Sequence, residues 1–403
     1  MHDETKCLKV PAANGAFASL SVPVHRASTI VFDSVDAYQN RRSAMYDGYS
    51  YGLYGTPTTR TLEQAIAALE GASRALVVPS GFAAIALTTL TFCAPGQRVL
   101  FPDNAYDTVR PFADRFLGRL GIKPVFYDPS LGSRIADLLD SSVQLVWVES
   151  PGSMTLEVQD VPAITAACQA RGILTAADNT YATPLRCKPL SLGVDLSICA
   201  ASKYVSGHSD VVMGSVAVNN EDIFRQLKDH SRFLGQVVSA DEASLVLRGM
   251  ETMAVRLDRC EQSALQLLPM LQASNAVREI RHPALPENPG HQFWKRDFTG
   301  STGLITLFLE PWTRPLLAKA IEAMDQFAIG ASWGGTKSVV AVLDQPPLRT
   351  ATPAPHHGPV VRLSIGMEHP EDLRASLEKC LSILAAATPD GIANDKDLGR
   401  AQP

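Results

Sequence analysis

Residues 75–84 read Ala-Leu-Val-Val-Pro-Ser-Gly-Phe-Ala-Ala, the clearest strand–turn–helix pattern in the chain. The first four residues are typical of a buried strand, the Pro-Ser-Gly at 79–81 of a tight turn, and a small-residue helix is expected from about Phe82. Residues 75–97 contain no charged side chain and are long enough on paper to cross a bilayer. Because the turn divides them, we interpret the stretch as a buried strand–loop–helix unit and not as a membrane span.

Short apolar runs alternate with helical patterns in the same way between about residues 60 and 250. This alternation predicts a mostly parallel sheet covered by helices on both faces. In such sheets ligands bind at the carboxyl ends of the strands. The other runs lie at residues 98–101, 143–148, 173–177, 196–200 and 214–218.

The pattern changes after about residue 240. A long helical segment is expected at about residues 241–271, and strand-like runs reappear at 303–309, 338–343 and 360–365. These runs predict a smaller C-terminal α+β domain. Residues 388–403 lose apolar periodicity, which predicts a flexible tail.

Composition and charge exclude several kinds of partner. The net charge of -5 offers no basic field for nucleic acid or anionic lipid. The seven cysteines lie far apart without the spacings of a metal site, so we expect free thiols, no metal and a reducing compartment. The N-terminus mixes both charge signs and lacks the layout of a secretory signal, and the predicted location is therefore the cytoplasm.

Four polar features follow the apolar runs, and the first two lie in the predicted parallel sheet. The turn at Ser80 and Gly81 leads into a helix N-terminus, whose free N–H groups and positive dipole suit a phosphate. An ordinary βα turn is the alternative interpretation. Asp178 ends the run 173–177 and could hold a proton on a heterocyclic nitrogen, although a strand-end aspartate also commonly caps the next turn.

The other two features are an amine and a guanidinium. Lys203 is the first charged residue after Asp195. Burial lowers the pKa of a lysine toward the range in which the neutral amine is a nucleophile, whereas the alternative is a lysine that extends into solvent. Arg362 is the one guanidinium in an apolar run; its fork geometry matches a carboxylate, and a structural ion pair is the alternative.

Together the four features fit one cofactor, pyridoxal 5′-phosphate (PLP). This cofactor requires a phosphate cradle, a carboxylate for the pyridine nitrogen and an amine for the aldehyde. Its amino acid substrate requires a partner for the α-carboxylate, which the arginine supplies.

The sequence resembles the Cys/Met-metabolism family of PLP enzymes from about residue 51 to residue 373. Its most specific blocks are Ser-Lys-Tyr at 202–204 and Gly-His-Ser-Asp at 207–210. Trp333 and the Phe-Trp-Lys-Arg-Asp at 293–297 favour the cystathionine β-lyase branch, since γ-acting relatives usually carry an aliphatic residue at the tryptophan position. Further matching blocks are residues 51–59, 149–158, 282–286, 332–335 and 362–368.

The resemblance implies a fold of PLP-dependent transferase type I, similar to aspartate aminotransferase. It divides the chain into an N-terminal arm (residues 1–55), a PLP-binding α/β domain (56–250) and a C-terminal α+β domain (251–403). The arm would contribute to a neighbouring subunit's site. A homotetramer is implied, with a dimer as the smallest active unit.

The resemblance also implies a role for each matching residue. Lys203 would hold the cofactor covalently and transfer protons, Asp178 would pair with the pyridine nitrogen, and Tyr106 would stack on the ring and share the proton transfer. Tyr51 would bind cofactor and act in catalysis at the neighbouring subunit's site. The phosphate would be held by Ser80, the backbone of Gly81 and Phe82, and Ser202. The substrate would be held by Arg362, Ser332 and Trp333.

Three positions depart from the family pattern. Leu53 stands where many relatives carry a phosphate-binding arginine, so either PLP binds more weakly here or another cation such as Arg60 compensates for the lost contact. Lys337 stands where relatives usually have glutamate, which changes the charge at the pocket mouth. Phe82 replaces a common methionine, a minor change because its backbone makes the contact.

The implied activity is β-elimination from L-cystathionine to L-homocysteine, pyruvate and ammonia, a step of trans-sulfuration and methionine biosynthesis. A γ-acting or cysteine-conjugate lyase or synthase of the same family is one alternative. A non-catalytic PLP-binding regulator is another, although the sequence has no appended DNA-binding module to support it.

Overall fold

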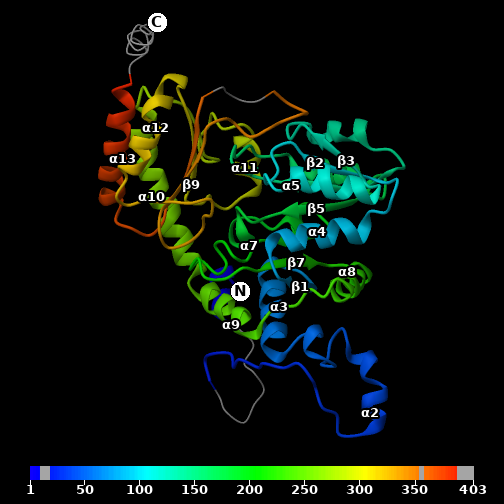
Figure 1. Ribbon diagram of the computed structural model, residues 1–403. Coiled ribbons are helices and arrows are strands. Elements are labelled where there is room, and N and C mark those ends of the chain that lie inside the picture. The colour runs from blue at the N-terminus through cyan, green and yellow to red at the C-terminus, as the bar shows by residue number, and fades with distance from the viewer. Residues whose placement is uncertain (10–18, 354–357, 388–403) are drawn as a thin grey trace, which may run out of the picture.

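The computed structural model describes residues 1–9, 19–353 and 358–387 (Figure 1). Two β-sheets organise the chain, one from its first part and one from its last. The strands of the first sheet are β1 (Arg74–Val78), β2 (Arg98–Pro102), β3 (Lys123–Tyr127), β4 (Val143–Glu149), β5 (Leu174–Asp178), β6 (Leu196–Cys199) and β7 (Gly214–Val218). They lie in the order β1-β7-β6-β5-β4-β2-β3.

This large sheet is mostly parallel, which confirms the prediction from the alternating runs. Strands β2 to β6 pair in parallel, whereas β7 runs antiparallel to both β6 and β1. Each predicted run forms a strand, and β3 is an edge strand that the pattern does not predict. The carboxyl ends of the parallel strands therefore meet at one edge of the sheet.

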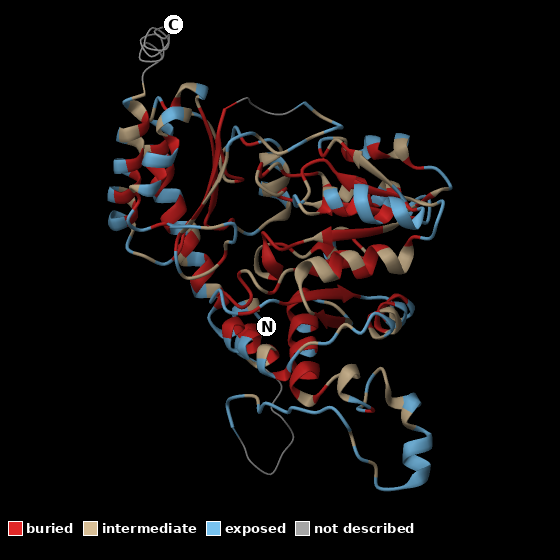
Figure 2. Ribbon diagram, in the orientation of Figure 1, coloured by how far each residue is buried: buried red, intermediate tan, exposed pale blue. Residues whose placement is uncertain are grey.

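Helices cover both faces of the large sheet. The helices of this part of the chain are α1 (Asp3–Leu8), α2 (Val35–Gln39), α3 (Pro57–Glu70), α4 (Gly81–Phe92), α5 (Val109–Phe112), α6 (Val161–Gln169), α7 (Thr183–Arg186), α8 (Glu221–Phe233) and α9 (Ala240–Glu251), of which α2 lies away from the sheet on the N-terminal arm. Successive side chains of β1 point to opposite faces. Leu76 and Val78 pack with α4, α5 and α8, whereas Ala75 and Val77 pack with α3 and α9. Figure 2 shows the resulting buried sheet between helices whose outer sides are exposed.

The C-terminal part forms a second, smaller sheet. Its strands are β8 (Val277–Arg281), β9 (Leu304–Leu309), β10 (Ala328–Ile329), β11 (Val339–Leu343) and β12 (Val360–Ser364), and its helices are α10 (Met253–Gln272), α11 (His291–Asp297), α12 (Leu317–Glu322) and α13 (Pro370–Ala385). The order β10-β11-β12-β9-β8 is antiparallel except between β10 and β11. Helices α10, α12 and α13 pack a separate apolar core against it.

The helical segment predicted at residues 241–271 is confirmed, and it consists of two helices, α9 and α10, that meet at Thr252. The hydroxyl of Thr252 donates to the carbonyl of Gly249 at 3.3 Å. Buried Arg256 donates to the same carbonyl at 2.7 Å. These side chains satisfy a carbonyl at the end of α9, so the helix ends there without a glycine or proline signal in the sequence.

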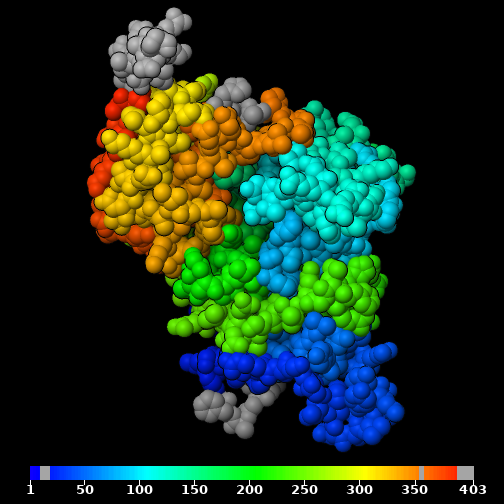
Figure 3. Space-filling view, in the orientation of Figure 1, coloured from blue at the N-terminus to red at the C-terminus, as the bar shows by residue number. Residues whose placement is uncertain are grey.

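The part of the N-terminal arm that carries α2 projects from the rest of the chain, whereas α1 packs against α3 and α9 (Figure 3). Helix α2 has no buried residue, and Val31 and Val35 are 88% and 72% exposed. The arm's place in a neighbouring subunit and the predicted domain limits stay predictions, and the predicted tail at 388–403 lies outside the described residues. None of the helices in the described part has the length and apolar character that crossing a bilayer requires.

Candidate active site

A cavity of about 390 Å³ opens at the carboxyl ends of the parallel strands, between the large sheet and β12. It brings together residues from segments that lie far apart in the sequence. The predicted site residues that line it are Ser80, Gly81, Phe82, Tyr106, Asp178, Ser202, Lys203, Ser332, Trp333 and Arg362. Tyr51 lies outside this cavity, on the arm, where its hydroxyl accepts a hydrogen bond from Ser28 at 3.3 Å.

The turn between β1 and α4 forms one end of the cavity. Ser80 caps α4, and its hydroxyl accepts the N–H of Ala83 at 2.9 Å. The first N–H groups of a helix have no acceptor within the helix, so those of Gly81 and Phe82 are available to an anion. A Cβ on Gly81 would lie 2.5 Å from the Cβ of Ala200. Only glycine therefore permits this close approach of the turn to the end of β6.

Ser202 also lines the cavity, but its hydroxyl already has backbone partners. It donates to the carbonyl of Met213 at 3.1 Å and accepts the N–H of Met213 at 2.9 Å. A hydroxyl has a single proton. Ser202 can therefore donate to a phosphate only by releasing the Met213 carbonyl.

Lys203 is half-buried and its amine faces the cavity. Nζ donates to the hydroxyl of Ser332 at 2.8 Å and lies 5.4 Å from the ring centroid of Trp333. Burial lowers the pKa of Lys203, the nearby Arg362 lowers it further, and Asp178 opposes both. The neutral amine is thus more populated here than on a solvent-exposed lysine. This favours a nucleophilic lysine over one that simply extends into solvent.

Asp178 ends β5 at the wall of the cavity. Its Oδ1 accepts the N–H of Thr180 at 3.0 Å and the hydroxyl of Thr180 at 2.5 Å, so it does cap the following turn. Burial raises the pKa of Asp178, while the two Thr180 hydrogen bonds and the Lys203 amine lower it. Asp178 therefore both caps the turn and lines the cavity, because a single carboxylate oxygen is enough for the cap.

Glu149 is a site residue that the sequence reasoning did not single out. It ends β4, directly opposite Asp178 on the neighbouring strand, and lines the same cavity. Its Oε2 accepts the backbone N–H of Tyr106 at 2.7 Å. Burial and the neighbouring Asp178 raise the pKa of Glu149 well above its ordinary range. The sequence contained a signal for Glu149, because this carboxylate directly follows an apolar run, as Asp178 does.

Arg362 lies on β12 and points its guanidinium toward the cavity from the second sheet. Nη2 donates to the carbonyl oxygens of Ala331 at 2.6 Å and Ser332 at 3.4 Å. Nη1 contacts the sulfur of Met154 at 3.5 Å. These contacts position the guanidinium through neutral groups, so its charge remains to attract a carboxylate.

The structure also places the residues that depart from the family pattern. Arg60 is buried, its Nη1 pairs with Glu63 at 2.9 Å, and it does not line this cavity, so compensation for Leu53 by Arg60 stays a prediction. An arginine held by a buried carboxylate is not released to a second anion without leaving that carboxylate unpaired. Lys337 is exposed and does not line the cavity.

Residues 4–382 match the model of a family described as "Cys/Met metabolism PLP-dependent enzyme". A Rhizobium johnstonii protein named "putative cystathionine β-lyase" is 41% identical, over 91% of this chain and 92% of its own. The cystathionine β-lyase MetC of Escherichia coli is 38% identical, over 88% of this chain and 91% of its own.

A relative with a different name has a similar identity. The L-alanine/L-glutamate racemase of Wolbachia pipientis is 35% identical, over 91% of this chain and 93% of its own. Among solved structures, a cystathionine γ-synthase from Xanthomonas oryzae pv. oryzae superposes with a TM-score of 0.87 at 28% identity. That match covers 96% of this chain and 100% of the other.

Proposed function

The chain belongs to the Cys/Met metabolism family of PLP-dependent enzymes, and on this premise we propose that it is a carbon–sulfur β-lyase that cleaves L-cystathionine. The products are L-homocysteine, pyruvate and ammonia. The observation that carries the proposal is the meeting of Lys203, Asp178 and Arg362 in one cavity, beside Trp333.

The cavity residues fit the cofactor. The start of α4 offers backbone N–H groups for the phosphate, and Gly81 leaves the space that this contact requires. Asp178 is the carboxylate for the ring nitrogen, and Lys203 is the amine for the aldehyde. When bound, PLP supplies an electron sink for the bond that breaks at Cα of the amino acid.

The protein's own groups hold the substrate and move its protons. Arg362 binds the α-carboxylate, with Ser332 and Trp333 beside it. The neutral amine of Lys203 removes the proton from Cα, and Lys203 or the hydroxyl of Tyr106 gives a proton to the departing sulfur. Water then converts the remaining three-carbon fragment to pyruvate and ammonia. A negative charge on Asp178 would favour a protonated ring nitrogen in the bound cofactor.

An amino acid racemase is a second candidate, because one relative carries that name and the same proton transfer begins both reactions. Lys203 and Tyr106 both line the cavity. If one takes the Cα proton and the other returns a proton to the opposite face, the amino acid is inverted and no keto acid forms.

A γ-acting enzyme is the third candidate, since the cystathionine γ-synthase structure shares the fold. Elimination at the γ carbon gives 2-oxobutyrate instead of pyruvate. A PLP-binding regulator would give no product with any thioether amino acid.

We further propose a homotetramer in the cytoplasm. The exposed apolar side chains Val31, Val35 and Tyr51 of the arm support burial against another subunit. All seven cysteines are unpaired and buried, which suits a reducing compartment.

Product analysis distinguishes these functions. The purified holoenzyme is incubated separately with L-cystathionine and L-alanine, and the keto acid, free thiol and D-alanine are measured. Pyruvate and homocysteine in equal amounts are expected. 2-Oxobutyrate from cystathionine would move the protein to the γ-acting branch, and D-alanine without any keto acid would make it a racemase.

A further inference from the structure

The turn at residues 152–157 forms a wall of the active-site cavity and has an unusual backbone. Met154 and Leu156 both have positive φ angles, 62° and 52°, although neither is glycine. Hydrogen bonds from Gly152 N–H to the carbonyl of Glu157 at 2.9 Å and from Leu156 N–H to the carbonyl of Gly152 at 3.0 Å close the turn. Such conformations persist only where surrounding contacts hold them.

Arg349, in the segment between β11 and β12 of the second sheet, supplies one of those contacts. Nη1 and Nη2 donate to the two carboxylate oxygens of Glu157 at 3.0 and 2.7 Å, and Nη2 also donates to the hydroxyl of Thr155 at 2.8 Å. The Arg349 side chain is only 4% exposed. A lysine cannot make this pair of parallel hydrogen bonds to a carboxylate. Because the Arg349–Glu157 ion pair is buried, solvent and salt screen it little.

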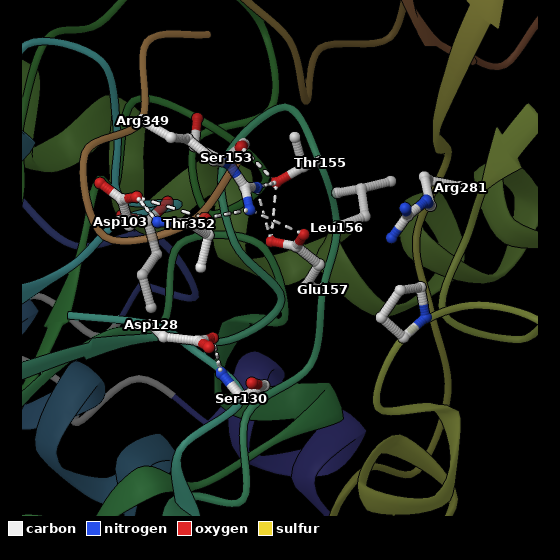
Figure 4. A network of polar contacts seen from close by, with 12 residues as sticks. Asp103, Asp128, Ser130, Ser153, Thr155, Leu156, Glu157, Arg281, Arg349 and Thr352 are labelled. Atoms are coloured by element: carbon white, nitrogen blue, oxygen red, sulfur yellow. Dashed lines mark hydrogen bonds and ion pairs between the residues drawn. The ribbon is translucent and has the colours of Figure 1, made fainter. Parts of the chain in front are cut away.

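The segment that carries Arg349 is itself fixed to the large sheet. Asp103, at the end of β2, accepts the backbone N–H groups of Thr350, Ala351 and Thr352 at 3.0, 2.8 and 3.0 Å. Figure 4 shows Arg349 between the Asp103–Thr352 contact and the Thr155–Glu157 contact. Arg349 is therefore held at a fixed distance from the turn, and through it Met154 is held as well.

Met154 lies where two cavities meet. A second cavity, of about 600 Å³, adjoins the active site and shares with it Tyr106, Ser153, Met154 and Arg362. Its remaining walls are largely apolar and include Phe126, Ile329, Val340, Val342 and Leu348.

We propose that Met154 determines which substituents on the substrate sulfur the site accepts, because its side chain contacts Arg362 and separates the two cavities. Arg349 is the positioning residue: it fixes the turn 152–157 and thereby holds Met154 in this place. The inference rests on the proposed lyase function. With Met154 in place the site takes slender substituents such as the homocysteine group of cystathionine. Without it, the apolar second cavity admits cysteine thioethers with a bulky aryl group.

Selectivity between two thioethers tests this proposal. The ratio of kcat/KM for S-benzyl-L-cysteine to that for L-cystathionine is measured for the wild type, Met154→Ala and Met154→Leu. Met154→Ala should raise the ratio about tenfold or more, because it removes three non-hydrogen atoms of the side chain that separates the two cavities. Met154→Leu keeps the volume and should keep the ratio close to the wild-type value.

Arg349→Ala and Arg349→Lys test the clamp. Both should raise KM for cystathionine about fivefold or more with kcat within about twofold, because Arg362 loses its fixed neighbour while Lys203 is untouched. The dissociation constant for glycine, followed by the visible spectrum of bound cofactor, should rise in parallel without any turnover. Asp344→Asn is the matched control, because Asp344 lies in the same segment between β11 and β12 and forms an exposed ion pair with Arg314. This variant should change neither KM for cystathionine nor the dissociation constant for glycine.

Several results would overturn the proposal. One is a selectivity ratio for Met154→Ala within twofold of the wild type; this variant leaves the clamp intact and decides the matter even if Arg349→Ala does not fold. Another is a loss in kcat alone for the folded Arg349 variants. If the wild type released no keto acid from either thioether, the lyase function would fail, whereas the glycine measurement would still report on the Arg349 clamp.

Discussion

Replacement of Asp178 by asparagine isolates one charge at the centre of the site. Asparagine has the same shape, and its Oδ1 can accept both hydrogen bonds from Thr180, at 3.0 and 2.5 Å. What is lost is the negative charge facing the cavity and its interaction with Lys203. Hydrogen bonds to charged groups contribute about 1.5 to 3 kcal/mol. Since about 1.4 kcal/mol is a factor of ten in rate, kcat should fall roughly 10- to 150-fold.

Stability should respond differently from activity. Burial disfavours the charged form of Asp178, as its raised pKa indicates, so the neutral asparagine costs the fold little. The melting temperature should stay within about 3 °C of the wild type. Steady-state pyruvate release, cofactor absorbance and thermal unfolding are measured on the same preparation. An unchanged kcat with full cofactor content would refute the assigned role of the carboxylate.

Three further changes have distinct expected outcomes. Lys203→Ala should abolish pyruvate release and alter the visible absorption of the cofactor; near-normal turnover would contradict its role. Glu70→Gln should raise stability at pH 8 by up to about 3 kcal/mol and change it little at pH 4, measured by urea unfolding. Burial raises the pKa of Glu70 to about 7, so the folded state binds the extra proton and loses stability as pH rises from about 4.5 to 7. Gly81→Ala should weaken PLP binding about tenfold or more in equilibrium dialysis, because the new Cβ would lie 2.5 Å from Ala200; unchanged affinity would exclude this turn as the phosphate site.

The large sheet could be predicted because its strands are buried on both faces and appear as continuous apolar runs. The missed strands lack that signal. β3 is an edge strand that begins with exposed Lys123, and β8 reads Val-Arg-Glu-Ile-Arg. The break at Thr252 depends on Arg256 reaching back to a carbonyl, a contact that helical periodicity does not encode.

The site residues divide in the same way. Lys203, Asp178 and Arg362 could be singled out because each is a lone charge beside an apolar run. Glu149 had the same local signal, but its importance arises from the pairing of β4 with β5, which places it opposite Asp178. Arg349 had no local signal, because its partner Glu157 lies 192 positions away in another loop.

The claim on which the rest depends is that Lys203 carries the cofactor. The most direct measurement is reduction of the purified holoenzyme with borohydride, followed by proteolysis and mass spectrometry of the peptides. A reduced pyridoxyl phosphate group on the peptide that contains Lys203, and on no other lysine, is the expected result. The group on a different lysine, or on none in a preparation that releases pyruvate, would contradict the account.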